Sequence, residues 1–155
     1  MTLHSHQSGL ATVEFAIVGL WFLIVLFAVL EFGRLLYTVN ILSETVRRAA
    51  RVAVVCPIND PNIVQAAMFG GGADSALLGN LNADNLQLTY LDEAGAAVAD
   101  PVGGFSSIRY VQASIVGYQH TLLIPMLQQT LSVPLFLATL PRESLGVSPE
   151  GVQCF

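Results

Sequence analysis

An apolar segment near the start of the chain limits what this protein can fold into. Residues 10–30 contain one charged residue, Glu14. As an α-helix these 21 residues would be about 31 Å long at about 1.5 Å per residue, which matches a hydrocarbon core of about 30 Å. The nearest rival, residues 121–140, is interrupted by Pro125 and Pro134. The sequence therefore predicts one membrane-spanning helix.

The composition supports a membrane protein and argues against nucleic-acid binding. Of the 155 residues, 54% are apolar and only 11% are charged, unlike an ordinary soluble domain. The chain has no lysine, and 11 acidic residues outweigh six arginines, for a net charge of -5. Because nucleic-acid binding needs a basic surface, we expect no nucleic-acid partner.

Glu14 is the residue of the predicted span that needs an explanation. An ionisable group in a spanning helix costs about 2.5 to 3.5 kcal/mol even on lenient insertion scales. Glu14 lies five residues after Gly9. Cleavage after Gly9 would give Leu10 a new α-amino group. A cation and an anion would then lie one helical turn apart.

This order of glycine, four residues, glutamate and an aromatic residue, ahead of an apolar helix, resembles the processing site of type IV pilin-like proteins. The pair Glu14-Phe15 and the sequence R-R-A-A-R at residues 47–51 are similar to TadE-like minor pilins of the tight-adherence (Tad, or Flp) system. The resemblance covers residues 8–55, and L-P-R-E-S-L-G at residues 140–146 is similar to the end of that family's domain.

The resemblance implies processing and assembly through the N-terminal helix. Residues 1–9 would be a leader that a prepilin peptidase removes after Gly9, leaving Leu10 as the first residue. Glu14 and Phe15 would take part in assembly, with Glu14 contacting the N-terminus of a neighbouring subunit. The implied partners are other pilin subunits, the peptidase, the inner-membrane assembly platform and membrane lipid.

The resemblance also implies a location, with which the distribution of arginine disagrees. It implies a bacterial inner-membrane protein with one span and an extracytoplasmic C-terminal domain that later reaches a pilus or the cell surface. Arg34 and three further arginines follow the span, whereas residues 1–9 have no arginine or lysine, so the positive-inside rule favours a cytoplasmic domain. We follow the resemblance, because a nine-residue leader with a cleavage site is hard to explain otherwise.

The predicted helix continues well beyond the span. Glu31 with Arg34 and Glu44 with Arg48 are spaced i,i+3 and i,i+4 with the acid first, which stabilises a helix surface. Pro57 disfavours helical angles in the residue before it and ends the helix. Apolar residues at steps of four and three form one seam: Leu35, Val39, Leu42, Val46, Ala49 and Ala53.

These patterns divide the chain into a leader (1–9), a spanning part (10–33), an amphipathic continuation (34–56) and a small domain (57–155). In the domain the sequence predicts a short helix over residues 61–69, then a strand at residues 86–90 and a turn at 92–95. It further predicts a long strand at residues 107–120 with a bulge near Tyr110, and an edge strand at 131–140 containing Pro134. The fold class is α+β: a long helix packed on a small antiparallel sheet, the general plan of pilin-like subunits.

The sequence offers no set of residues able to converge for catalysis. His120 is the one histidine beyond the first nine residues. A lone histidine at a strand end is more typical of a surface or capping residue than of a base or ligand. We therefore expect neither an enzyme nor a cofactor or metal site.

The two cysteines, Cys56 and Cys154, can close one bridge if the domain is exported to an oxidising compartment. The bridge would tie the helix end to the C-terminus. For a loop of about 100 residues the chain-entropy model gives about 4.7 kcal/mol of stabilisation. Two free thiols are the alternative.

About 100 residues beyond the helix favour a minor subunit at the tip, the base or the initiation complex of an adhesive pilus, since major subunits of this system are little more than the helix. Two alternatives stay open. A pseudopilin of a type II secretion system would share the helix and Glu14. An unprocessed, membrane-anchored interaction module would keep residues 1–9.

Overall fold

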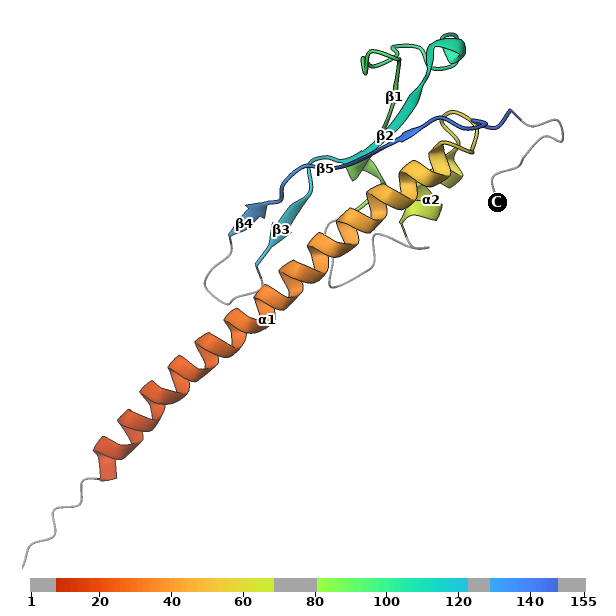
Figure 1. Ribbon diagram of the computed structural model, residues 1–155. Helices are drawn as coiled ribbons and strands as arrows, with labels where there is room; N and C mark the ends of the chain where they lie inside the picture. Colours follow the sequence, from red (N-terminus) through yellow and green to blue (C-terminus); the bar gives the residue numbers. More distant parts are fainter. Residues whose placement is uncertain (1–7, 69–80, 123–128, 148–155) are drawn as a thin grey trace, which may run out of the picture.

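The first helix is one continuous element with two different halves. The computed structural model describes residues 8–68, 81–122 and 129–147. Helix α1 (Ser8–Ala53) contains 46 residues and is about 69 Å long at about 1.5 Å per residue. Its first half projects alone from the rest of the chain, and its second half lies against the domain (Figure 1). The predicted continuation beyond the apolar segment is confirmed.

The second half of α1 is amphipathic, as its spacing predicts. Leu42, Val46, Ala49 and Ala53 are buried, and Leu35 and Val39 are half-buried. On the opposite face Glu44, Arg47 and Arg51 are exposed, while Arg48 is half-buried. The seam therefore faces the domain and the charges face away from it.

A short helix follows the end of α1. Helix α2 (Pro61–Ala67) is capped by Asp60, whose carboxylate accepts a hydrogen bond of 2.9 Å from the backbone N–H of Asn62, and Pro61 occupies the first helical position. Ile63 and Ala67 are its buried residues. The predicted helix over residues 61–69 therefore forms but ends at Ala67, with Met68 as its C-cap, and residue 69 lies outside the described residues.

The strands form two antiparallel sheets. Strands β1 (Leu86–Leu91), β2 (Tyr110–Ile115) and β5 (Phe136–Pro141) form a sheet in the order β1-β2-β5. Strands β3 (Gln119–Thr121) and β4 (Thr130–Ser132) form a separate hairpin, in which His120 lies opposite Leu131. Two 3₁₀ helices, η2 (Ala83–Asn85) and η3 (Phe105–Ser107), precede β1 and β2.

Three details of the predicted strands are wrong. The expected strand at residues 107–120 is divided into β2 and β3 at Gly117, whose φ of 68° is a left-handed conformation that glycine adopts without steric cost. There is no bulge at Tyr110, which pairs in regular register with Leu91 and Pro141. Likewise residues 131–140 form two strands with Pro134 between them, although β5 is an edge strand as expected.

The core lies between α1 and the three-stranded sheet. α1 contacts β2 and β5, and two apolar clusters fill the interface. One contains Leu42, Val46, Ala113 and Ile115, and the other contains Ala53, Ile63, Tyr90, Ile108, Val111 and Leu145. The predicted α+β arrangement, a long helix packed on a small antiparallel sheet, is confirmed.

The chain after β5 returns to the end of α1 and closes the domain. The backbone N–H of Leu145 donates to the Val54 carbonyl at 3.1 Å, and that of Gly146 donates to the Val55 carbonyl at 2.7 Å. Gly146 has a φ of 78°, and a Cβ there would lie 2.6 Å from the Cγ and 2.8 Å from the Cα of Pro57. Only glycine fits this position without displacing Pro57.

Candidate functional site

The predicted processing site lies in the first turns of α1, where nothing else in the described chain covers it. Gly9 and Leu10 are both exposed. A Cβ built on Gly9 would meet nothing within 4 Å. The glycine is therefore not required by packing at this position.

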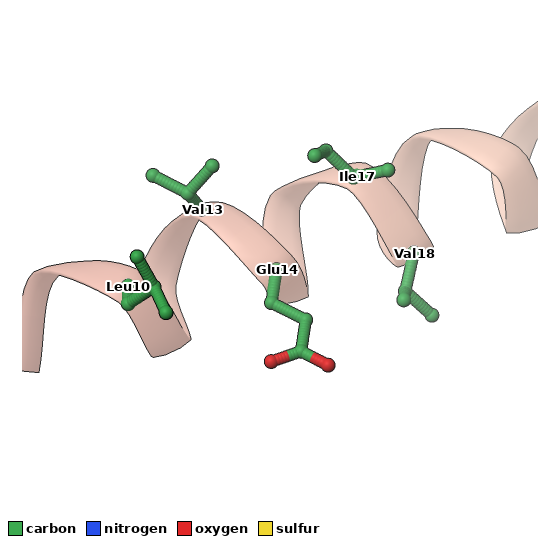
Figure 2. Close-up of a pocket in the computed structure, with 5 residues that line it drawn as sticks. All are labelled: Leu10, Val13, Glu14, Ile17 and Val18. Atoms are coloured by element: carbon green, nitrogen blue, oxygen red, sulfur yellow. The ribbon is translucent and has the colours of Figure 1, made fainter. Parts of the chain in front are cut away.

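Glu14 lies on the same exposed half of α1. Figure 2 shows Leu10, Val13, Glu14, Ile17 and Val18 lining a shallow apolar groove on the helix surface. Leu10, Glu14 and Val18 are spaced by four residues and lie along one side of the helix. The Glu14 carboxylate points outward, away from Val13 and Ile17.

The arrangement leaves the Glu14 carboxylate without a partner in the described part of the chain. None of the described residues forms an ion pair with it. In lipid such a carboxylate would be strongly disfavoured, so a helix of this kind gains from a cation supplied at the same depth. Two sources have the required chemistry: the α-amino group of a processed Leu10, one turn away, and the same group of another subunit.

A second polar cluster lies where the exposed half of α1 meets the domain, and we call it the boundary cluster: Glu31, Arg34, Thr38, Tyr118 and His120. Arg34 and Glu31 form the predicted i,i+3 ion pair, with 2.6 Å between Nη2 and Oε1. His120 Nε2 lies 3.2 Å from the same carboxylate oxygen. Arg34 also donates to the backbone carbonyl of Thr121.

The boundary cluster is largely removed from water. The side chains of Arg34 and Glu31 are only 9% and 11% exposed, and that of His120 is 1% exposed. The Thr38 hydroxyl donates to the Arg34 carbonyl at 3.0 Å. Burial raises the pKa of Tyr118, whereas its hydrogen bond with Thr38 and the nearby charge of Arg34 act in the opposite direction.

The sequence interpretation of His120 as a surface or capping residue is wrong. The imidazole is buried against α1 and contacts a residue 89 positions earlier in the chain. The spacing of Glu31 and Arg34 indicated a local pair but not its third member. No sequence signal joined His120 to that pair.

The segment of α1 that carries the groove and Glu14 resembles a known protein family. Residues 9–51 match the family model for TadE-like protein. The match confirms the resemblance over residues 9–51, and it associates this segment with the tight-adherence pilus system in general terms. The similarity at residues 140–146 lies outside the match and stays a prediction. We call residues 9–51 the TadE-like segment; it contains Gly9, Glu14 and Phe15 and ends within α1.

The TadE-like segment covers less than a third of the chain and leaves the domain outside the match. Searches of curated proteins and of solved structures found no match. Among the described residues, α1 is the one helix long and apolar enough to cross a membrane. The TadE-like segment is therefore compatible with a single-span anchor.

Of the two cysteines in the predicted disulfide, only Cys56 lies among the described residues. Cys56 is 2% exposed and lies directly after the last turn of α1. Cys154 lies outside the described residues. The bridge between them stays a prediction.

Proposed function

We propose that this chain is a minor pilin or pseudopilin of a tight-adherence pilus, assembled through α1. One observation carries the proposal: the TadE-like segment presents Glu14 on an exposed helix where no described residue pairs with its charge. A carboxylate in such a place is suited to a partner outside the chain. The proposal includes no catalytic role.

In the proposed mechanism α1 first stores the subunit in the inner membrane, with the domain on the extracytoplasmic side. A prepilin peptidase then cuts after Gly9, and Leu10 gains an α-amino group. Glu14 pairs with the N-terminal amine of a neighbouring subunit in the helix bundle of the pilus. Leu10 and Glu14 are four residues apart, so this pairing would offset two parallel helices by about 6 Å along their axes.

The ion pair would act mainly on the register of the subunits. Taking two charges out of water offsets most of their attraction, so a buried pair adds little net stability. An unpaired Glu14 in the same bundle would be costly, and only one axial offset avoids it. Pairing therefore favours that offset over others.

The domain is the part that would distinguish a minor subunit from the shaft. It adds two sheets, and its core is built against the second half of α1. We place it at the tip, the base or the initiation complex, where it would act as an interaction surface during adhesion or assembly. The assembly platform and other subunits would reach the protein through α1.

Glu14→Gln tests this function, because it removes the charge and keeps the size of the side chain. The variant should be inserted in the membrane and processed normally, yet fail to support wild-type piliation. Glu44→Gln is the matched control, since it removes the same charge from an exposed position on the domain half of α1. Wild-type piliation in cells with Glu14→Gln would remove Glu14 from the mechanism.

A further inference from the structure

Strand β3 runs along α1 toward its apolar half. Tyr118, just before β3, hydrogen-bonds Thr38, and His120, within β3, contacts Glu31. As the chain advances from residue 118 to 120, its contacts on α1 move seven residues back toward the N-terminus. The β3–β4 hairpin therefore points toward the apolar half of α1, as Figure 1 also shows.

The helix rise gives the depth of this contact. Residues 10–30 match the thickness of the hydrocarbon core, so Glu31 lies at its edge. Arg34 follows Leu30 by four residues, or about 6 Å at about 1.5 Å per residue. The polar layer outside the hydrocarbon is about 5 to 7 Å thick on each side. Strand β3, which contacts both Glu31 and Arg34, therefore lies within that layer.

The composition of the hairpin fits this depth. Residues 116–141 contain no aspartate, glutamate, lysine or arginine. All three residues of β4 are exposed, with Leu131 39% exposed. The exposed acidic residues Glu93 and Asp100 lie in the segment between β1 and β2. Asp84 is exposed beside Asn85, which hydrogen-bonds Val116 just before β3. The domain thus presents its uncharged, partly apolar hairpin to the side from which the membrane helix emerges.

Another face of α1 supports the same boundary. Phe32 and Tyr37 are exposed apolar residues that follow the apolar segment 10–30. Tyr37 follows Leu30 by seven residues, or about 10 Å at about 1.5 Å per residue, so its Cα lies just beyond the polar layer. Side chains in a helix tilt toward the N-terminus, which brings the Tyr37 ring back toward that layer. Tyrosine is enriched at this level of membrane proteins, because its ring is apolar and its hydroxyl is polar.

We propose that the β3–β4 hairpin rests on the lipid surface of the membrane that α1 crosses, with Leu131 in the headgroup layer. The boundary cluster holds the hairpin to α1 at this depth. The domain then contacts the membrane at two places, the helix and the hairpin, which fixes its tilt. This inference rests on the proposed insertion of α1, and the hairpin would leave the lipid when the subunit enters a pilus.

Tryptophan quenching by lipid tests the inference on the full chain. Trp21 is the only tryptophan and lies in the predicted span, so a Trp21→Phe background accepts one reporter at a time. Leu131→Trp is the test variant and Val102→Trp, at an exposed site remote from the hairpin, is the control. Both are placed in phosphatidylethanolamine and phosphatidylglycerol vesicles that contain lipid brominated near the headgroup end of the acyl chain.

We expect Leu131→Trp to lose fluorescence in the brominated vesicles and Val102→Trp to keep it. Ser132→Trp, at the adjacent exposed position, should show the same loss and replaces Leu131→Trp if that variant does not fold. Wild-type protein, with Trp21 and lipid brominated deep in the chain, reports separately on the insertion of α1.

The outcomes separate this inference from the proposed function. Quenching of Trp21 without quenching at residues 131 and 132 would overturn the hairpin contact and leave the insertion of α1 intact. Protection of Leu131→Trp from acrylamide without lipid quenching would mean that another protein copy covers the hairpin, and would also overturn it. An unquenched Trp21 would overturn both the insertion and the inference.

Discussion

Glu31→Gln is the substitution whose cost follows most directly from the structure. It keeps the size of the side chain and removes the negative charge of the Glu31 carboxylate, which both Arg34 and His120 contact. Arg34 would keep its hydrogen bond to the Thr121 carbonyl but would lose its ion-pair partner in a position that is 9% exposed. Removing one member of a buried pair costs about 3 to 5 kcal/mol. We expect about 3 kcal/mol, because the glutamine oxygen still accepts one hydrogen bond.

Thermal unfolding of the full chain in detergent micelles measures this cost, with the near-UV circular dichroism of the domain tyrosines as the signal. For a domain of 60 to 100 residues, about 1 kcal/mol corresponds to about 4 to 8 °C in Tm. Glu31→Gln should therefore lower the Tm by about 12 °C or more. Glu44→Gln, on the exposed face of the same helix, should stay within about 0.5 kcal/mol of wild type.

A triple variant separates charge from packing. Glu31→Leu with Arg34→Met and His120→Leu replaces the Glu31–Arg34 ion pair and the imidazole beside it with apolar side chains, and replacing a buried ion pair in this way is often neutral or stabilising. It should restore most of the Tm that Glu31→Gln loses. If Glu31→Gln and Glu44→Gln have the same Tm, the boundary cluster does not hold the domain to α1.

Three further substitutions have clear expectations. Gly146→Ala should destabilise the domain more than Gly95→Ala, because both need a positive φ, at a cost of about 1 to 2 kcal/mol, but only Gly146 also lacks space for a Cβ; equal melting temperatures would contradict the close approach. Cys154→Ser should lower the Tm in oxidising buffer by removing a bridge worth about 4.7 kcal/mol or less; an unchanged Tm would exclude an important bridge. Gly9→Ala should keep the leader in a gel mobility assay, whereas Gly19→Ala, also in open space, should be processed normally. Normal processing of Gly9→Ala would exclude a prepilin peptidase site there.

The long helix was predictable because its signals are local. Apolar residues at steps of three and four define the buried side of α1, and Glu31 and Arg34 pair within one turn. The cap at Asp60 and the alternation in β1 are local too. Each of these features depends on residues within a few positions of one another.

The parts that the sequence did not reveal depend on distant residues. His120 is buried because β3 returns to α1, and nothing near it in sequence indicates that return. The division of residues 107–120 at Gly117 depends on one backbone angle within an otherwise strand-like pattern. Residues 131–140 are divided for another reason: β4 and β5 belong to different sheets, and residues 133–135 connect them.

The intact mass of the protein isolated from its native membrane shows directly whether the chain is cleaved after Gly9. We expect a mature chain that lacks residues 1–9 and begins at Leu10, because a free α-amino group there is the cation that Glu14 requires. Under non-reducing conditions the same measurement reports the predicted bridge as a loss of two hydrogens. A chain that keeps residues 1–9 while the peptidase is active would contradict the pilin account and indicate an unprocessed, membrane-anchored interaction module.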